Sequence, residues 1–324
     1  MNQETTEGLR ALQLLIATAR SDGKGDGAER EAIDRAFASL PLPEGYSVDR
    51  LLSEEIQVDA ILNDIQTPEI RRAAYEAAYL LAHADGAYTD PEKQLLQKAR
   101  GIWGLPAETD AELDREVDLV ATSAIEPSLA TGVSSPAERE TAIRKLTNRY
   151  CVLTALTGGI PVPLVGDLMV VPMQTKMVYD IGKLYNCQVN PAMVKSLLAA
   201  LGIGTGARIA VSSLSKLIPG WGSLVGASTA YATTFALSKA TSQFFGEGAK
   251  ELSENLRTTY QQALPEGTKA YEASRSTLEQ RKDLQSEIAE LGSRLKNGTL
   301  AATEYDRQVS VLLGRAQQGM QAAS

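Results

Sequence analysis

Apolar residues recur every three or four positions along most of the chain, which is the spacing of one face of an α-helix. Residues 7–20 and 68–84 show this pattern most clearly, and Pro68 stands at the first turn of the second segment. Residues 106–121 form a further segment of the same kind. Patterns typical of β-strands are almost absent. We therefore predict an all-α fold that begins with a helical bundle.

The middle of the chain is more apolar. Residues 217–238 carry no charged side chain, and as a helix they would extend about 33 Å, enough to cross the roughly 30 Å hydrocarbon core of a bilayer. Ser and Thr side chains lower the hydrophobicity of this run, so spanning and surface contact both stay open. A second run, 151–175, contains Gly, Pro (Pro172 among them) and the single Asp167, which predicts a helical hairpin or a re-entrant pair.

Polar helical patterning returns toward the C-terminus. Residues 270–296 place Leu and Ile at helical spacing among charged residues, which suits a short coiled coil or a helix docked on a partner. After Asn297-Gly298 we expect a second short helix that carries Tyr305, Val309 and Leu312.

Charge is divided unevenly between the two parts of the chain. Residues 1–140 contain 27 Asp and Glu against 13 Lys and Arg, whereas residues 141–250 contain three acidic residues against ten basic ones. The predicted organisation is an acidic helical bundle in 1–125, a linker in 126–140, a hydrophobic cationic helical domain in 141–250, and polar helices with a C-terminal hairpin in 251–324. The N-terminus lacks the basic segment of a secretory signal, so we expect a cytoplasmic protein.

A short acidic phrase, Asp-Gly followed six residues later by Glu, occurs twice, each time between two apolar helical runs. A third carboxylate lies between the Asp and the Glu in both copies. Divalent cations such as Ca²⁺ bind several oxygen ligands, and neither copy matches an EF-hand loop, so one site would be shared between the two turns. The candidate ligands are Asp22, Asp26 and Glu29 from the first copy and Asp85, Asp90 and Glu92 from the second.

Helix capping is an alternative explanation for several of these residues. Asp26 followed three positions later by Glu29 has the form of a capping box, and Asp90 before Pro91 predicts an N-cap with Pro at the first helical position. Capping does not require Asp-Gly at the same distance from Glu in both copies. The single histidine, His83, precedes the second turn and is interpreted either as a ligand or base or as a helix-end residue.

No catalytic or nucleotide-binding constellation is recognisable. No serine or cysteine has an evident base partner, and the glycine-rich stretch 202–206 lacks the last glycine of G-x-G-x-x-G. We expect a non-enzymatic protein with no nucleic-acid partner.

The two acidic phrases resemble the paired acidic motifs of the TerB family of tellurite-resistance proteins, over roughly residues 5–125. This resemblance implies an all-helical bundle, a surface acidic cluster that binds divalent metal through the six carboxylates named above, and a bacterial stress response near the inner membrane.

Two further resemblances cover the rest of the chain. The glycines and prolines of 158–167 and the run Ile218-Pro219-Gly220 resemble the hydrophobic domain of unknown function of YcjF-type inner-membrane proteins, which implies membrane association. Residues 295–313 resemble the short helical hairpin at the C-terminus of many bacterial oligomeric or membrane proteins, which implies a homo-oligomer.

Together these expectations describe a membrane-associated stress-response or scaffold protein with a metal-binding acidic head and an oligomerising tail. Two alternatives stay open. One is a membrane-remodelling or pore-forming helical protein, and the other is a soluble oligomer that buries residues 141–250 between copies.

Overall fold

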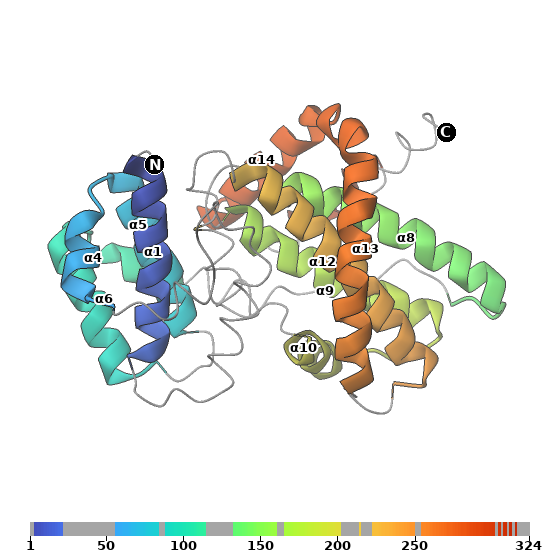
Figure 1. The fold of residues 1–324 in the computed structure, drawn as a ribbon. Helices are drawn as coiled ribbons and strands as arrows, with labels where there is room; N and C mark the ends of the chain where they lie inside the picture. Colours follow the sequence, from blue (N-terminus) through green and yellow to red (C-terminus); the bar gives the residue numbers. More distant parts are fainter. Residues whose placement is uncertain are drawn as a thin grey trace. The chain divides into compact units, whose positions relative to one another are not determined.

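The computed structural model describes seven long stretches of the chain, with Leu214 and eight residues of 304–315 in addition: 3–21, 56–83, 88–114, 132–160, 165–201, 222–249 and 254–301. In these residues the regular secondary structure is helical throughout, which confirms the all-α prediction (Figure 1). The chain forms two compact units. Unit 1 comprises 1–121, 161–167 and 204–225, and unit 2 comprises 122–160, 168–203 and 226–324.

Unit 1 contains four of the helices labelled in Figure 1. They are α1 (Gln3–Arg20), α4 (Val58–Asp64), α5 (Pro68–Ala82) and α6 (Asp90–Trp103). A further helical segment covers 108–114. The predicted apolar stripes of the first two segments face each other, because α1 and α5 pack closely and every residue of 11–18 is buried. The alanines of α5, among them Ala74, Ala77 and Ala78, are fully buried and let the two helices approach closely.

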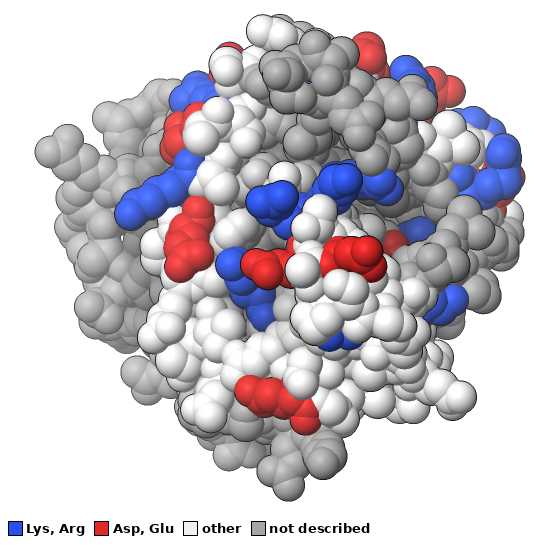
Figure 2. Space-filling model, turned by 90° about the vertical axis from the view of Figure 1, so that its right-hand side faces the viewer, with Lys and Arg blue, Asp and Glu red and all other residues white. Residues whose placement is uncertain are grey.

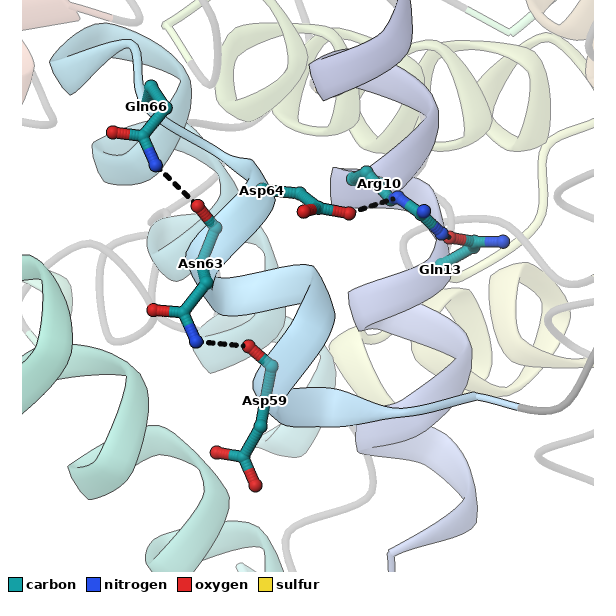
Figure 3. A network of polar contacts seen from close by, with 6 residues as sticks. All are labelled: Arg10, Gln13, Asp59, Asn63, Asp64 and Gln66. Carbon is teal, nitrogen blue, oxygen red and sulfur yellow. Dashed lines mark hydrogen bonds and ion pairs between the residues drawn. The ribbon is translucent and has the colours of Figure 1, made fainter.

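Polar contacts fix the register of α1 against the chain that leads into α5. Glu7 accepts a hydrogen bond from the backbone N–H of Thr67, the N-cap of α5, at 2.9 Å, and Gln3 donates to its other oxygen at 2.8 Å. Burial acts to raise the pKa of the Glu7 carboxyl, but these hydrogen bonds outweigh it and lower the pKa below its usual value. Arg10 forms an ion pair with Asp64 at the end of α4, at 2.9 Å (Figure 3).

This register sets the direction of the two helices. Glu7 lies in the first turns of α1 and meets the N-cap of α5, and the two helices pack extensively on each other. They therefore run in the same direction. Counted from this contact, thirteen residues lead to Arg20 in α1 and fifteen to Ala82 in α5, or about 20 and 22 Å at 1.5 Å per residue. Both helices thus end at the same end of unit 1.

The remaining helices lie in unit 2, except that the first residues of α9 and of α12 belong to unit 1. They are α8 (Pro136–Gly158), α9 (Val165–Leu184), α10 (Pro191–Ala200), α12 (Gly222–Gly246), α13 (Glu254–Glu279) and α14 (Lys282–Lys296). The helices α8 and α9 form an antiparallel hairpin, as predicted for 151–175, since Tyr150 contacts Asp180 and Thr157 contacts Met173. Pro172 does not interrupt the second arm, because α9 continues through it. The side chain of Asp167 lies outside the described residues.

The helix α12 is the central helix of unit 2. It packs on α8 and α9, and also on α13, where Tyr231 meets Tyr271 with ring centroids 5.9 Å apart. Within 226–246 only Lys239 and Gly246 are exposed. A helix surrounded by others needs apolar or small residues on every face, so packing inside unit 2 explains why the described part of the uncharged run carries no charge. None of the described helices combines the length and apolar character that crossing a membrane requires.

Small residues allow the close packing around α12. A methyl group built on Gly158 would lie 2.5 Å from the carbonyl oxygen of Gly226, and one on Gly267 would lie 2.7 Å from Cα of Ala232. Both distances are shorter than van der Waals contact, so no side chain larger than that of glycine fits at either position without a shift. The helices α8 and α13 therefore approach α12 at these glycines. These are the close approaches that the Gly-rich composition of the segment allows.

The C-terminal region differs from the sequence prediction in one respect. Residues 270–296 do not form one helix, because α13 ends at Glu279 and α14 begins at Lys282. After Gly298, which has a φ of +68°, the described residues of 304–315 are helical and bury Tyr305, Val309 and Leu312. The predicted short hairpin is therefore present.

Candidate functional site

The six predicted metal ligands fall into two groups. Asp22, Asp26, Glu29 and Asp85 lie outside the described residues, and Asp90 and Glu92 lie at the start of α6. The described residues next to the acidic turns are the ends of α1 and α5 and the beginning of α6. These helix ends define the candidate site.

The end of α5 is built from a stack of aromatic rings. His83 is the C-cap of the helix, and its ring lies between those of Tyr79 and Tyr88, with centroid distances of 4.1 Å to each. The Nδ1 atom lies 2.8 Å from the backbone carbonyl oxygen of Tyr79. Because a carbonyl only accepts, Nδ1 carries the proton in this contact, and the lone pair of the neutral ring is on Nε2. The histidine is therefore a helix-end residue with a fixed ring orientation.

Glu92 caps the beginning of α6. One oxygen of its carboxylate, Oε2, accepts hydrogen bonds from the backbone N–H and the hydroxyl of Thr89, at 2.7 and 2.8 Å. The N-cap is Thr89, not Asp90 as predicted, and Glu92 at the third helical position completes a capping box. The shift by one residue arises because a Thr hydroxyl and a following Glu can satisfy the free N–H groups without Asp90. Glu92 is 7% exposed, as expected of a carboxylate bound to its own helix end.

Asp90 is consequently free of the capping role. Its side chain is 87% exposed and makes a weak ion pair with Lys93 at 3.4 Å. Of the two described candidate ligands, Asp90 is thus the accessible one, and Glu92 has one oxygen engaged in the cap.

Sequence reasoning missed a second set of carboxylates that supports the stack. Tyr75 donates to Asp110 at 2.5 Å and Tyr79 donates to Asp114 at 2.8 Å, and Arg100 pairs with the second oxygen of Asp110 at 2.5 Å. Burial, with the hydrogen bond to the neighbouring carboxylate, raises the pKa of both tyrosines above their usual range. The signal was present in the sequence, because the tyrosines and the aspartates are each four residues apart and so share a helix face.

The direction of α1 and α5 determines where the two acidic turns begin. Ser21, the last described residue after α1, donates to the Thr18 carbonyl at 2.8 Å, and Asp22 follows it directly. Asp85 follows His83 by two residues. Since both helices end at the same end of unit 1, the described chain stops at that end before each acidic phrase. Within the residues that the structure describes, no group of three His, Cys, Asp or Glu side chains is placed to hold a metal ion.

Comparisons with known proteins give no match: no family model, no curated protein and no solved structure resembles this chain significantly.

Proposed function

We propose that this chain is a non-enzymatic protein whose acidic N-terminal part, residues 1–125, binds one divalent cation between its two acidic turns. Ca²⁺ is the ion that we propose before Mg²⁺ and Zn²⁺. The observation that supports the proposal is the parallel packing of α1 and α5, because it starts both acidic phrases at the same end of unit 1. Two turns at opposite ends would need separate sites, and three carboxylates within eight residues are too few for a complete oxygen cage.

The second turn is anchored at both ends. His83 is stacked and hydrogen bonded before it, and Thr89 and Glu92 fix the helix start after it. Fixed ends lower the entropy lost when the intervening residues bind an ion. Because Glu92 is the cap, we propose Asp85 and Asp90 as the main ligands from this copy, with Asp22 as their main counterpart.

Calorimetric titration of the full-length protein with Ca²⁺, Mg²⁺ and Zn²⁺ tests the site. We expect binding heat with at least one of these ions, and loss of that heat in both Asp22→Asn and Asp85→Asn. Glu266→Gln, which changes an exposed carboxylate in unit 2, is the control and should bind as the unchanged protein does. Absence of heat and of any stability change at millimolar ion concentrations would refute the proposal.

Self-association through the C-terminal hairpin is the second part of the proposal. The described residues of α14 and 304–315 line an open pocket of about 310 Å³, in which Leu291 and Leu312 lie among side chains of both charges. Val311 beside them is 53% exposed, although it is a large apolar residue. A surface that carries an apolar centre and both charges can be self-complementary. Sedimentation of the full chain should show an oligomer that Val311→Glu dissociates, and a monomeric unchanged chain would contradict this part.

A stress-response setting near a bacterial inner membrane also belongs to the proposal and rests on the resemblances of the sequence. The face drawn in Figure 2 shows Lys and Arg interspersed with Asp and Glu. Residues 141–250 carry ten basic side chains against three acidic ones. Anionic lipid attracts each basic side chain near its surface by about 1 kcal/mol. We expect salt-sensitive flotation with anionic liposomes.

The membrane-remodelling alternative would require α12 to leave its packing in unit 2. Dye leakage from the same liposomes would favour this alternative.

A further inference from the structure

Five oxygen-bearing side chains lie buried inside unit 2 on α8, α9 and α12, which pack together. We call this cluster the polar junction, and each of its members is at most 7% exposed: Thr147, Tyr150, Asp180, Ser238 and Thr241. The acidic head does not involve these residues, and helix packing alone does not require a carboxylate in such a place.

Two oxygens of the junction have no hydrogen-bond partner among the described residues. Tyr150 donates to Oδ2 of Asp180 at 2.8 Å, and the hydroxyls of Thr147 and Ser238 lie 2.5 Å apart. The other carboxylate oxygen, Oδ1 of Asp180, and the hydroxyl oxygen of Thr241 remain unpartnered. A buried carboxylate whose hydrogen-bond donor is a neutral hydroxyl is costly, because its charge has left water.

The register of the helices places these two oxygens at the same level. About two turns earlier, Gln174 of α9 donates to the hydroxyl of Thr234 of α12 at 3.0 Å, and further along, Tyr185 and Phe245 stack. The two helices therefore run in parallel. Asp180 follows Gln174 by six residues and Thr241 follows Thr234 by seven, so both lie about 9 to 10.5 Å beyond that contact.

The orientation of α12 supports the same arrangement. Thr234 contacts Gln174 of α9 and also Thr154 of α8, at 2.9 Å, so it points between these two helices. Thr241 is two helical turns later and lies on the same face as Thr234. Asp180 reaches Tyr150 of α8, about one turn from Thr147 of the same helix, which meets Ser238 of α12.

We propose that the polar junction binds a small monovalent cation, Na⁺ or K⁺, with Oδ1 of Asp180 and the hydroxyl of Thr241 among its ligands. The available ligands are all oxygens, which suits a hard cation. They carry one formal negative charge, which a monovalent ion balances, whereas divalent ions are usually bound by more carboxylates. A water molecule would satisfy the hydrogen bonds but would bring no positive charge to the buried carboxylate.

The bound ion links three helices of unit 2, so folding depends on its concentration. We expect the melting temperature of the full-length protein to rise by roughly 3 to 5 °C for each tenfold increase in Na⁺ or K⁺ above its Kd, at constant ionic strength set with choline chloride. Asp180→Asn keeps the size and an acceptor for Tyr150 but removes the charge, and should abolish this dependence. The excess line width of the ²³Na resonance should vanish in the same variant.

Two matched variants separate ion binding from a structural role. Thr241→Val removes the unpartnered hydroxyl at nearly constant shape, so it should weaken the salt response without lowering the melting temperature in choline. Thr154→Val removes a hydroxyl that is already bonded to Thr234, so it should lower the melting temperature and leave the salt response intact. Equal salt responses and ²³Na line widths in the unchanged protein and Asp180→Asn would show that the junction holds water only, and would overturn the proposal.

Discussion

Replacing Glu92 by Gln separates helix capping from metal binding in the second acidic turn. The carboxylate accepts two hydrogen bonds from Thr89, at 2.7 and 2.8 Å, and lies at the positive end of the α6 dipole. Gln keeps one acceptor oxygen but loses the negative charge. Hydrogen bonds to charged groups contribute about twice as much as neutral ones, and the dipole adds a further 0.3–1 kcal/mol, so we expect a loss of about 1–2 kcal/mol in unfolding free energy.

Trp103 provides the signal for this measurement. It is the last residue of α6, is 7% exposed, and donates to the carbonyl of Leu62 at 2.8 Å. Urea denaturation followed by its fluorescence, in a Trp221→Phe background, should report the loss of stability in unit 1. Asp90→Asn is the control, because an exposed ion pair at 3.4 Å is worth no more than about 0.5 kcal/mol.

For cation binding the order of the two variants should be reversed, so that Asp90→Asn has the larger effect on the affinity for Ca²⁺. Glu92→Gln should weaken the affinity for Ca²⁺ much less than Asp90→Asn does, because it loosens one end of the turn but removes no proposed ligand. The capping role is refuted if Glu92→Gln unfolds within about 0.3 kcal/mol of the unchanged protein. Loss of Ca²⁺ binding at unchanged stability would show that Glu92 is a ligand instead.

Three further predictions concern the two helical units. Tyr150→Phe should cost about 1–3 kcal/mol in denaturant unfolding, because it leaves Oδ2 of Asp180 buried without its donor; a change below 0.3 kcal/mol would contradict the pairing. Gly158→Ala should lower the unfolding free energy by about 1–3 kcal/mol, because the added methyl group overlaps α12. Gly101→Ala has open space around its position in α6 and should raise the unfolding free energy by about 0.5–1 kcal/mol. Equal melting temperatures of the two variants would contradict the packing. The lowered pKa of Glu7 contributes stability that is fully present above the unfolded-state pKa near 4.3 and is lost as the pH falls through the folded-state value, so Glu7→Gln should flatten the acid side of the stability curve.

The helical pattern predicted elements well where one face is buried. The apolar stripes of α1 and α5 follow a 3.6-residue period, and these helices pack on each other as that period requires. The pattern was less informative for α12, because a helix buried on all sides has no polar face, and an uncharged run of this length is equally typical of a core helix and of a membrane segment. Packing against three neighbours, which no local pattern records, explains its composition.

At the start of α6 the sequence predicted a capped helix end but assigned the cap to the wrong residue. The position of the cap shifted from Asp90 to Thr89 because several polar side chains compete for the same free N–H groups, and tertiary contacts decide among them. The carboxylates that bind Tyr75 and Tyr79 are 35 residues away in sequence. Their i,i+4 spacing was visible, but only the fold brings the two pairs together.

The number of Ca²⁺ ions bound per chain tests the central claim most directly. If the parallel ends of α1 and α5 bring the two acidic turns to one shared site, titration of the full-length protein should give one ion per chain, and Asp22→Asn alone should remove all binding. Two ions per chain, with one retained after Asp22→Asn, would show independent turns and would contradict the account.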